Sequence, residues 1–268
     1  MRLGVLVRNM GPQSARELVA AAARAVDACP AVDDVWVVDH VAIPPDDAEG
    51  SGGRYLEPLA TLAFLAGMTS RVHLGTAVLV IPYRPALLTA KWIATIQELS
   101  GERVLLGVGV GWMQPEFRAL GVDPHRRGRI TDDTLRFLDR CFANEIVEAN
   151  GQPFLFKPRP TRPPIFIGGS PQHAFRRALA HDAGWLPMGL SPDMLREPAA
   201  ELRQQAAAAG KPPPEVAVMG SLPLSDRTRT REAMAAYRDA GATRLIHAER
   251  YATIDDVHRM LDAIAGIA

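Results

Sequence analysis

Cysteine is scarce in this sequence, and long apolar segments and an excess of either charge are missing from it. Its 30 basic and 30 acidic residues balance to a formal net charge of zero, so no basic field indicates a nucleic-acid or anionic-membrane partner. The only two cysteines, Cys29 and Cys141, are far apart and fall in expected helices, which favours buried thiols and a reducing cytoplasm. No apolar run approaches the roughly 20 residues of a membrane-spanning helix, and the apolar start after Met1 is too short for a signal peptide. We therefore expect a cytoplasmic protein.

Lysine is rare, and the histidines are scattered. Lys91 falls in the middle of an expected helix, Lys157 in an insertion and Lys211 in a loop. Schiff-base aldolases need a lysine near a strand end inside a barrel, so that class fits poorly. The seven histidines show neither H-x-H nor H-E-x-x-H spacing, which argues against a metal-dependent hydrolase. No metal is expected, and a non-redox barrel enzyme is a disfavoured alternative.

Strand-like and helical patterns alternate along the whole chain. The eight expected strands are Leu3–Arg8, Asp34–His40, Val72–Leu79, Arg103–Gly109, Pro164–Gly168, Ala183–Pro187, Glu215–Met219 and Thr243–His247. A (β/α)8 barrel takes about 250 residues, so eight β/α units in 268 residues predict a single TIM-barrel domain over residues 1–268. A doubly wound open sheet is the alternative.

Some helix signals are specific enough to test. Between the third and fourth strands, apolar residues recur at helical spacing and are expected on one side of a helix. They are Leu88, Trp92, Ile96 and Leu99. Two helix starts resemble capping boxes, in which side chains satisfy free backbone N–H groups. These are Ser14-x-x-Glu17 and Thr253-x-x-Asp256.

Two segments depart from the even β/α spacing. The loop from Val41 to Leu56 is rich in Pro, Asp and Gly and is long enough to be a mobile cover over the barrel mouth. Residues 146–163 carry Asn150-Gly151 between short apolar stretches, which predicts a hairpin-like insertion before the fifth strand.

Asp39 and His40 close the second expected strand. Catalytic groups of TIM barrels lie at the carboxyl ends of strands, which is where this pair stands. Adjacent strand residues point to opposite faces, so only one of the two looks along the barrel axis. Histidine exchanges protons near neutral pH, which makes His40 the candidate proton donor or acceptor. In the alternative, Asp39 pairs with a backbone group or an arginine and His40 is a hydrogen-bonded rim residue.

The loop after the fourth strand contains Gly107, Gly109 and Gly111 at alternate positions. This spacing differs from G-x-G-x-x-G, so a Rossmann dinucleotide site is rejected. The glycines instead permit a tight exit from the strand, and Trp112 then either walls a pocket or packs under the next helix. Glu116 follows one helical turn later. A structural ion pair with Arg127 or Arg129 is favoured for Glu116 over a catalytic role.

Gly168-Gly169-Ser170-Pro171 is the strongest anion-site candidate. Ser170 suits the N-cap of a helix and Pro171 its first position. Free N–H groups and the helix dipole would then face the barrel mouth, ready for a phosphate. A plain helix cap explains the same residues.

These segments, in this order, resemble the bacterial-luciferase-like superfamily, and in particular its branch that uses the deazaflavin coenzyme F420. The matching pieces include Asp39-His40, Gly75-Thr76-Ala77-Val78, Pro82-Tyr83-Arg84-Pro85, Leu99 to Arg103, Gly107 to Trp112, Glu116-Phe117, Ala119 to Val122, Gly168-Gly169-Ser170 and Gly184-Trp185-Leu186-Pro187. The resemblance implies an oxidoreductase that transfers hydride between F420 and a small organic substrate. An FMN-dependent monooxygenase and a non-catalytic flavin-binding protein are the alternatives.

The resemblance also implies roles for particular residues. Asp39 and His40 would serve the hydride step, and a non-proline cis peptide would lie at Ala77–Val78, behind the ring. The cofactor-binding set would comprise Thr76, Ala77, Val78, Gly109, Trp112, Gly168, Gly169 and Ser170. Sugar-phosphate dehydrogenase relatives have an acidic residue where this chain has Trp112, which argues against such a substrate. Relatives often pair through helices of the N-terminal half, so a homodimer is expected.

Overall fold

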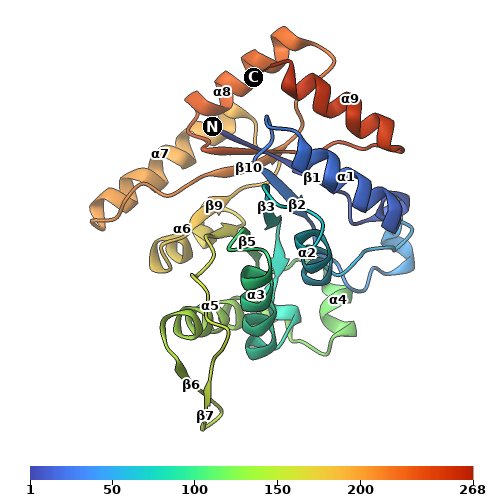
Figure 1. The fold of residues 1–268 in the computed structure, drawn as a ribbon. Helices are drawn as coiled ribbons and strands as arrows, with labels where there is room; N and C mark the ends of the chain where they lie inside the picture. The colour runs from blue at the N-terminus through green and yellow to red at the C-terminus, as the bar shows by residue number, and fades with distance from the viewer. Residues whose placement is uncertain (268) are drawn as a thin grey trace.

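The computed structural model describes residues 1–267 and contains a barrel of parallel strands inside a layer of helices (Figure 1). The strands are β1 (Arg2–Leu6), β2 (Asp34–Val37), β3 (His73–Thr76), β4 (Leu79–Val80), β5 (Val104–Gly109), β8 (Ile165–Gly168), β9 (Gly184–Leu186), β10 (Ala217–Gly220) and β11 (Arg244–His247). Their order is β10-β11-β1-β2-β3-β5-β8-β9, and β4 pairs with β5. Single parallel bridges, Trp185 to Val216 and Met188 to Met219, connect the two ends of this order. The barrel is therefore nearly closed, which confirms the predicted TIM barrel over the open sheet.

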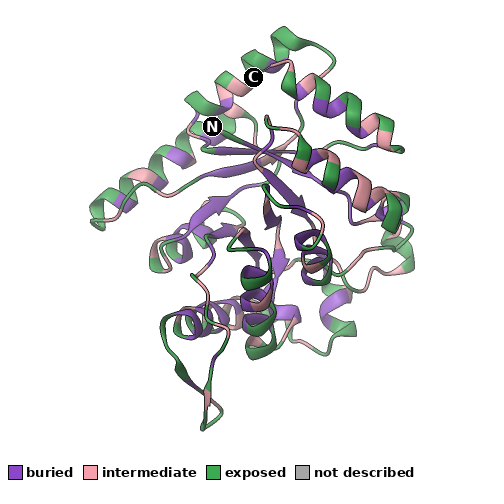
Figure 2. Cartoon of the chain, in the orientation of Figure 1, coloured by how far each residue is buried: buried purple, intermediate pink, exposed green. Residues whose placement is uncertain are grey.

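Nine helices of the described chain surround the barrel. They are α1 (Arg16–Ala28), α2 (Pro58–Ala66), α3 (Ala86–Leu99), α4 (Gln114–Ala119), α5 (Arg127–Ala143), α6 (Pro171–Ala180), α7 (Pro192–Ala208), α8 (Arg227–Asp239) and α9 (Ile254–Ala265). Figure 2 shows buried strands at the centre and helices whose outer faces are exposed. No helix within residues 1–267 is long and apolar enough to cross a membrane.

The two predicted capping boxes have different outcomes. Thr253 and Asp256 cap α9 reciprocally, as predicted. The box at Ser14 is wrong, because α1 begins after Ala15 and the Ser14 hydroxyl donates to the Gly11 carbonyl instead. A short 3-10 helix over Gly11–Ser14 uses Ser14 as its own last residue.

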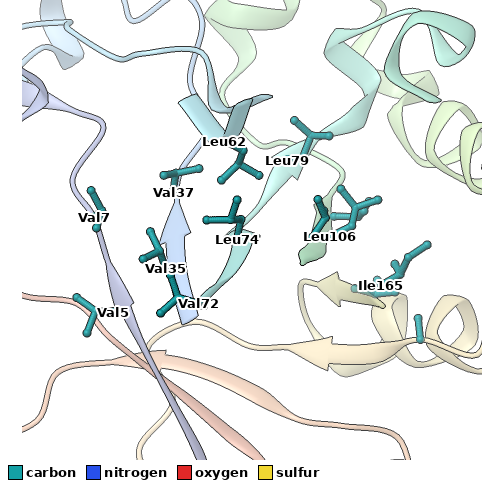
Figure 3. Packing of buried hydrophobic residues seen from close by; sticks show 14 of the residues in the cluster. Val5, Val7, Val35, Val37, Leu62, Val72, Leu74, Leu79, Leu106 and Ile165 are labelled. Carbon is teal, nitrogen blue, oxygen red and sulfur yellow. The ribbon is translucent and has the colours of Figure 1, made fainter. Parts of the chain in front are cut away.

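Alternate strand residues fill two separate cores, as the strand period of two requires. One set points outward and packs beneath the helices; Figure 3 shows Val35 and Val37 of β2 beside Leu74 of β3, with Leu62 of α2 nearby. The other set points inward and fills the barrel, and includes Leu6, Trp36, Ala77, Leu105, Phe166, Leu186, Ala217 and Ile246. The helix layer thus holds most of the apolar burial, while the barrel interior is a smaller plug.

Trp36 dominates that plug, and the neighbouring strands make room for it. A Cβ on Gly4 would lie 2.5 Å from Trp36 Nε1, and a Cβ on Gly75 would lie 2.3 Å from Trp36 Cε3. Such contacts are far below van der Waals separation, so only glycine fits on either side of the indole. Beneath Trp36, towards the amino ends of the strands, a fully buried ion pair joins Asp34 to Arg244.

Helix α3 forms where the apolar spacing predicts it, but most of its apolar side is exposed. Ile96 is buried, but Leu88, Trp92 and Leu99 are 59%, 47% and 71% exposed. The buried side of α3 is formed by small and polar residues as well, namely Thr89, Ala90, Ile93, Ala94, Ile96 and Gln97. The predicted apolar face therefore exists, but most of it is turned away from the barrel. It lies next to α2, where Phe64 is also exposed.

The two irregular segments are well formed. β6 (Ile146–Ala149) and β7 (Gln152–Leu155) pair antiparallel through Asn150 and Gly151, whose φ angles are 51° and 77°, which confirms the predicted hairpin. The loop after β2 contains a short 3-10 helix at Pro45–Asp47 and reaches Met10 through a bridge at Tyr55. Its mobility stays a prediction. Both thiols are free, as expected; Cys141 is buried, whereas Cys29, directly after α1, is only partly so.

Candidate active site

A cavity of about 590 Å³ opens at the carboxyl ends of the barrel strands. Its volume lies within the range of small-molecule and cofactor sites. The lining is mostly apolar, with a few polar side chains. It consists of Leu6, Arg8, Met10, Val38, Asp39, His40, Tyr55, Ala77, Val78, Val80, Tyr83, Gly111, Trp112, Met188, Met219, Ser221, Ala248, Glu249 and Arg250.

His40 reaches this cavity because it continues the inward row of β2. Trp36 points into the barrel, so Val38 and His40 follow on the same face at successive levels. The imidazole Nδ1 lies 2.9 Å from Glu116 Oε2, and its ring lies beside those of Tyr55 and Trp112. No protein group within residues 1–267 is hydrogen bonded to His40 Nε2.

Glu116, in α4, is the shared acceptor of this hydrogen-bond network. It is fully buried, and its carboxylate accepts from the Tyr83 hydroxyl at 2.9 Å and from the backbone N–H groups of Val41 and Ala42 at 2.6 and 2.9 Å. Burial alone would raise the pKa of Glu116, but hydrogen bonds from His40, the two backbone groups and Tyr83 lower that pKa to about 2. An ionised carboxylate only accepts, so Nδ1 of His40 carries the proton of this bond.

The expected ion pair of Glu116 with Arg127 or Arg129 is wrong. Arg127 instead donates to the carbonyl of Pro124, and Arg129 lies 3.7 Å from Asp133 one turn further along α5. The helix α4 ends at Ala119 and turns Glu116 back towards the end of β2. Tertiary packing therefore gives Glu116 partners that lie more than 30 residues away in sequence.

Asp39 points away from His40, as the strand alternation predicts. Its carboxylate accepts from both terminal nitrogens of Arg84, at 2.6 and 2.9 Å, and from the backbone N–H of Val80 at 2.8 Å. Arg84 also pairs with Glu57 at 2.8 Å. Burial raises the pKa of Asp39, and the hydrogen bonds from Arg84 oppose that rise. Asp39 is thus built into the wall of the site, with its charge committed to Arg84.

The segment between β3 and β4 forms one wall of the cavity. The Ala77–Val78 peptide bond is cis, as the resemblance implied, and both residues line the cavity. Thr76 does not reach the cavity; it is buried and its hydroxyl donates to the Gly107 carbonyl at 2.7 Å. Gly109 also lies behind the wall, where a Cβ would come within 2.4 Å of Val78 Cγ2.

Gly168, Gly169 and Ser170 stand at the end of β8, next to the cavity but outside its lining. A Cβ on Gly168 would lie 3.0 Å from Val78 Cγ1, so Val78 separates this turn from the cavity wall. Ser170 occupies the N-cap of α6 and Pro171 the first position, but the Ser170 side chain makes no capping hydrogen bond. Gly169 has a φ of 109° and no atoms within 4 Å of a built Cβ. Gly169 and Ser170 are exposed, which leaves their polar groups accessible.

Trp112 lies on the cavity lining, whereas His247 lies outside it. Trp112 is 73% exposed, lines the cavity and therefore walls it rather than packing under α4. His247 is fully buried outside the cavity; its Nδ1 accepts from the Leu222 N–H at 3.0 Å and its Nε2 lies 3.1 Å from Glu249. Burial lowers the pKa of His247, and Glu249 opposes that change. Among residues 1–267, no three His, Cys, Asp or Glu side chains are grouped so as to hold a metal ion.

Sequence reasoning found part of this site and missed part. It predicted Asp39, His40, Ala77, Val78 and Trp112, all of which line the cavity. It missed the partners that orient them, namely Glu116, Tyr83 and Arg84, and it missed Arg8 at the end of β1. One available signal for Arg8 was its position, since a charged residue closing a buried strand stands where Asp39-His40 stands on the next strand.

The arrangement can hold a flat ligand and move one proton. The wall at Ala77 and Val78 and the apolar lining suit a ring, and Gly169 and Ser170 offer polar groups for an anionic substituent nearby. His40, whose Nδ1–H is fixed by Glu116, presents Nε2 as the group that accepts or donates a proton.

Comparisons with known proteins agree with this architecture. A protein of Mycobacterium tuberculosis is 31% identical over 169 residues, which cover 61% of this chain and 58% of that relative. An F420-dependent secondary alcohol dehydrogenase, solved with an F420–acetone adduct, has a TM-score of 0.78 at 15% identity and covers 100% of this chain and 98% of its own. The oxygenating constituent of 3,6-diketocamphane monooxygenase of Pseudomonas putida, solved with FMN, has a TM-score of 0.78 at 13% identity, with coverage of 99% and 96%.

The two solved structures share the fold, and they bind different cofactors. The family description "Luciferase-like monooxygenase" matches residues 1–265, nearly the whole described chain. With this match and the barrel geometry together, the chain belongs to the luciferase-like monooxygenase family.

Proposed function

We propose that this protein transfers hydride between the deazaflavin coenzyme F420 and a small organic substrate. The observation that carries the proposal is the His40–Glu116 pair. A carboxylate with a pKa of about 2 fixes the His40 tautomer, and Nε2 is then the group at the cavity that exchanges a proton with the substrate. F420, when bound, supplies or accepts the hydride, and a protein group must manage the accompanying proton.

The residues present suit a coenzyme of this kind. Ala77, Val78 and Trp112 would bound the ring, with Thr76 and Gly109 supporting that wall from behind. Gly168, Gly169 and Ser170 would hold the phosphate. The absence of a side-chain cap from Ser170 favours this role, because the hydroxyl is free for a ligand. A Cβ at Gly169 would meet open space, so the turn has room for an anion.

FMN with oxygen chemistry is the second candidate. It is favoured by the FMN-bound solved neighbour and by an FMNH2-dependent dimethylsulfone monooxygenase of Pseudomonas putida, 28% identical over 204 residues. We prefer F420 because the series Gly111-Trp112, Glu116-Phe117 and Gly121-Val122 resembles that branch, and because an oriented proton-transfer group serves hydride chemistry directly.

The test is a titration of the purified protein with F420 and with FMN, read by quenching of coenzyme fluorescence. The proposal expects F420 to bind the more tightly, and a reduced F420 pool to be consumed only when a substrate is added. Tighter FMN binding with oxygen uptake would support the monooxygenase. Binding of either coenzyme without turnover across a broad substrate panel would support a non-catalytic carrier.

We further propose that the active form is a homodimer joined through α2 and α3. Leu88, Trp92 and Leu99 of α3 and Phe64 of α2 expose apolar side chains on adjacent helices, and a second copy would cover them. The molecular mass in light scattering should be twice the 29.0 kDa of the chain. Leu88→Glu, which places a charge on this face, should shift the protein to monomer.

A further inference from the structure

Arg8 is a buried cation with no protein partner. It follows β1 on the inward row of Gly4 and Leu6, is only 8% exposed and lines the cavity. Within residues 1–267 its guanidinium makes no hydrogen bond and no ion pair, and its buried Nε has no acceptor. The Arg8 backbone N–H, by contrast, donates to the Tyr251 hydroxyl at 2.9 Å, so the main chain here is fixed.

The acidic residues of the cavity are already committed elsewhere. Asp39 is held by Arg84, and Glu249 lies 3.1 Å from His247 Nε2. Glu116 accepts four hydrogen bonds and faces His40. Arg250, a second cation on the cavity lining, lowers the pKa of Arg8 further by like-charge repulsion. Arg8 is therefore a cation without an ion-pair partner among residues 1–267, on the strand next to that of the proton-transfer group His40.

A buried guanidinium without a carboxylate is unfavourable unless a ligand supplies one. Burial lowers the pKa of Arg8, and the Tyr251 hydroxyl opposes this change. Arginine presents a planar set of donors that matches a carboxylate in a bidentate arrangement. The remaining lining around Arg8 is apolar and includes Leu6, Met10, Met188 and Met219.

Arg8 could bind an anionic group of the substrate or one of the coenzyme. The strand topology distinguishes these two possibilities. In the strand order, β1 and β8 are four strands apart in a ring of eight, so they lie on opposite sides of the barrel. The proposed phosphate turn of Gly168, Gly169 and Ser170 follows β8, whereas Arg8 follows β1. Arg8 and His40 come from adjacent strands, with Leu6 level with Trp36.

From this placement, we infer that Arg8 determines substrate specificity by binding a carboxylate, so that the substrate is a small organic acid with an apolar body. The inference rests on the proposed function for the identity of the reaction. An acid held by Arg8 presents the carbon a few bonds from its carboxylate to His40. The Met and Leu side chains of the lining contact the rest of the molecule.

The experiment measures binding of matched pairs, 3-phenylpropanoate with its amide and benzoate with benzamide, by calorimetry to the full chain with and without coenzyme. The wild type should bind each carboxylate about 10–100-fold more tightly than its amide, the range expected for hydrogen bonds to charged groups. Arg8→Met should remove this preference, and Arg8→Lys should retain part of it. Arg250→Met is the matched control, because Arg250 is exposed on the rim, and it should keep the preference.

Each contrary outcome overturns the inference. These are equal binding of acid and amide by the wild type, loss of the preference in Arg250→Met but not in Arg8→Met, or a larger loss of coenzyme affinity than of carboxylate affinity in Arg8→Met. If Arg8→Met does not fold, the wild-type pairs and Arg8→Lys decide. If neither F420 nor FMN binds, the proposed function fails, while the carboxylate preference of the coenzyme-free protein still decides the role of Arg8.

Discussion

The two ends of the barrel use the same strands for opposite purposes. At the amino end, β2 and β11 contribute Asp34 and Arg244, which are fully buried and paired with each other beneath Trp36. At the carboxyl end, β2 contributes His40 and β1 contributes Arg8, which line an open cavity. The closed end pairs its charges within the protein. The open end presents a cation and an imidazole nitrogen that no side chain of residues 1–267 satisfies.

This contrast predicts that substitutions at the two ends have separable effects. A change at the closed end leaves a buried charge uncompensated and lowers the free energy of unfolding. A change at the open end removes a group that acts on the substrate and lowers turnover. Glu116 is an exception, because it is fully buried and also orients His40. Its substitution should therefore affect both stability and turnover.

The largest effect is expected at His40. His40→Ala should lower turnover about 10²–10⁴-fold, the usual loss when a general acid–base is removed, while coenzyme affinity stays within several-fold. The free energy of unfolding should fall by only about 1–3 kcal/mol, because the buried Glu116 carboxylate loses one hydrogen bond and keeps those from Tyr83 and two backbone N–H groups. Turnover would be followed with an activated nitro-compound or unsaturated ketone if the natural substrate is not in hand. Unchanged turnover would return His40 to a hydrogen-bonded rim residue.

The reverse pattern is expected at Asp34. Asp34→Asn should lower the free energy of unfolding by about 3–5 kcal/mol, because the buried Arg244 keeps only the partly exposed Glu215, 3.6 Å away, as a counter-charge. Turnover per folded molecule should be unchanged, as measured by denaturant unfolding and by activity on the same sample. The double variant Asp34→Leu with Arg244→Met is the control, and it should be more stable than Asp34→Asn. A large loss of turnover in a folded Asp34→Asn protein would contradict the separation of the two ends.

The strands and the hairpin were predictable from sequence because their signals are local. The eight apolar runs set the strands to within a few residues, and Asn150-Gly151 set the hairpin. Periodicity predicted an apolar side of α3, but it does not show what covers that side. Leu88 and Trp92 satisfy the same pattern whether they face the barrel or a partner.

The open end was only half predictable because its partners are distant in sequence. His40 and Asp39 could be placed by their strand end alone. Glu116 contacts His40 across 76 positions, and only the tertiary path of α4 brings it there. Its nearby arginines offered a plausible local ion pair that the fold does not use. Arg8 carried a positional signal, but its lack of a partner is visible only when every carboxylate around the cavity has been assigned.

Glu116 should make the free energy of unfolding depend on pH in acid, although it belongs to the open end of the barrel. Its pKa is lowered from 4.5 to about 2, so its stabilising contribution is complete above pH 4.5 and is lost as the pH falls towards 2. A shift of this size corresponds to about 3 kcal/mol. Glu116→Gln should therefore show a flatter dependence of unfolding free energy on pH between about 5 and 2 than the wild type does. It should also lower kcat, because an amide does not enforce one tautomer of His40. Parallel pH curves for the two proteins would contradict the assigned pKa.

The smallest effect is expected at the turn after β8, which belongs to the open end and lies at the proposed position of the coenzyme phosphate. Gly169→Asp introduces both a side chain at a φ of 109° and a negative charge beside the proposed phosphate position. Coenzyme affinity should fall about tenfold or more, because like charges repel and the N–H groups are obstructed. Gly169→Ala is the matched control, since it imposes the same backbone demand without the charge, and the difference between the two variants isolates the electrostatic part. Both should lose similar thermal stability without coenzyme. Equal coenzyme affinity in Gly169→Asp and Gly169→Ala would mean that no phosphate lies at this turn, and that Gly168, Gly169 and Ser170 serve only to start α6.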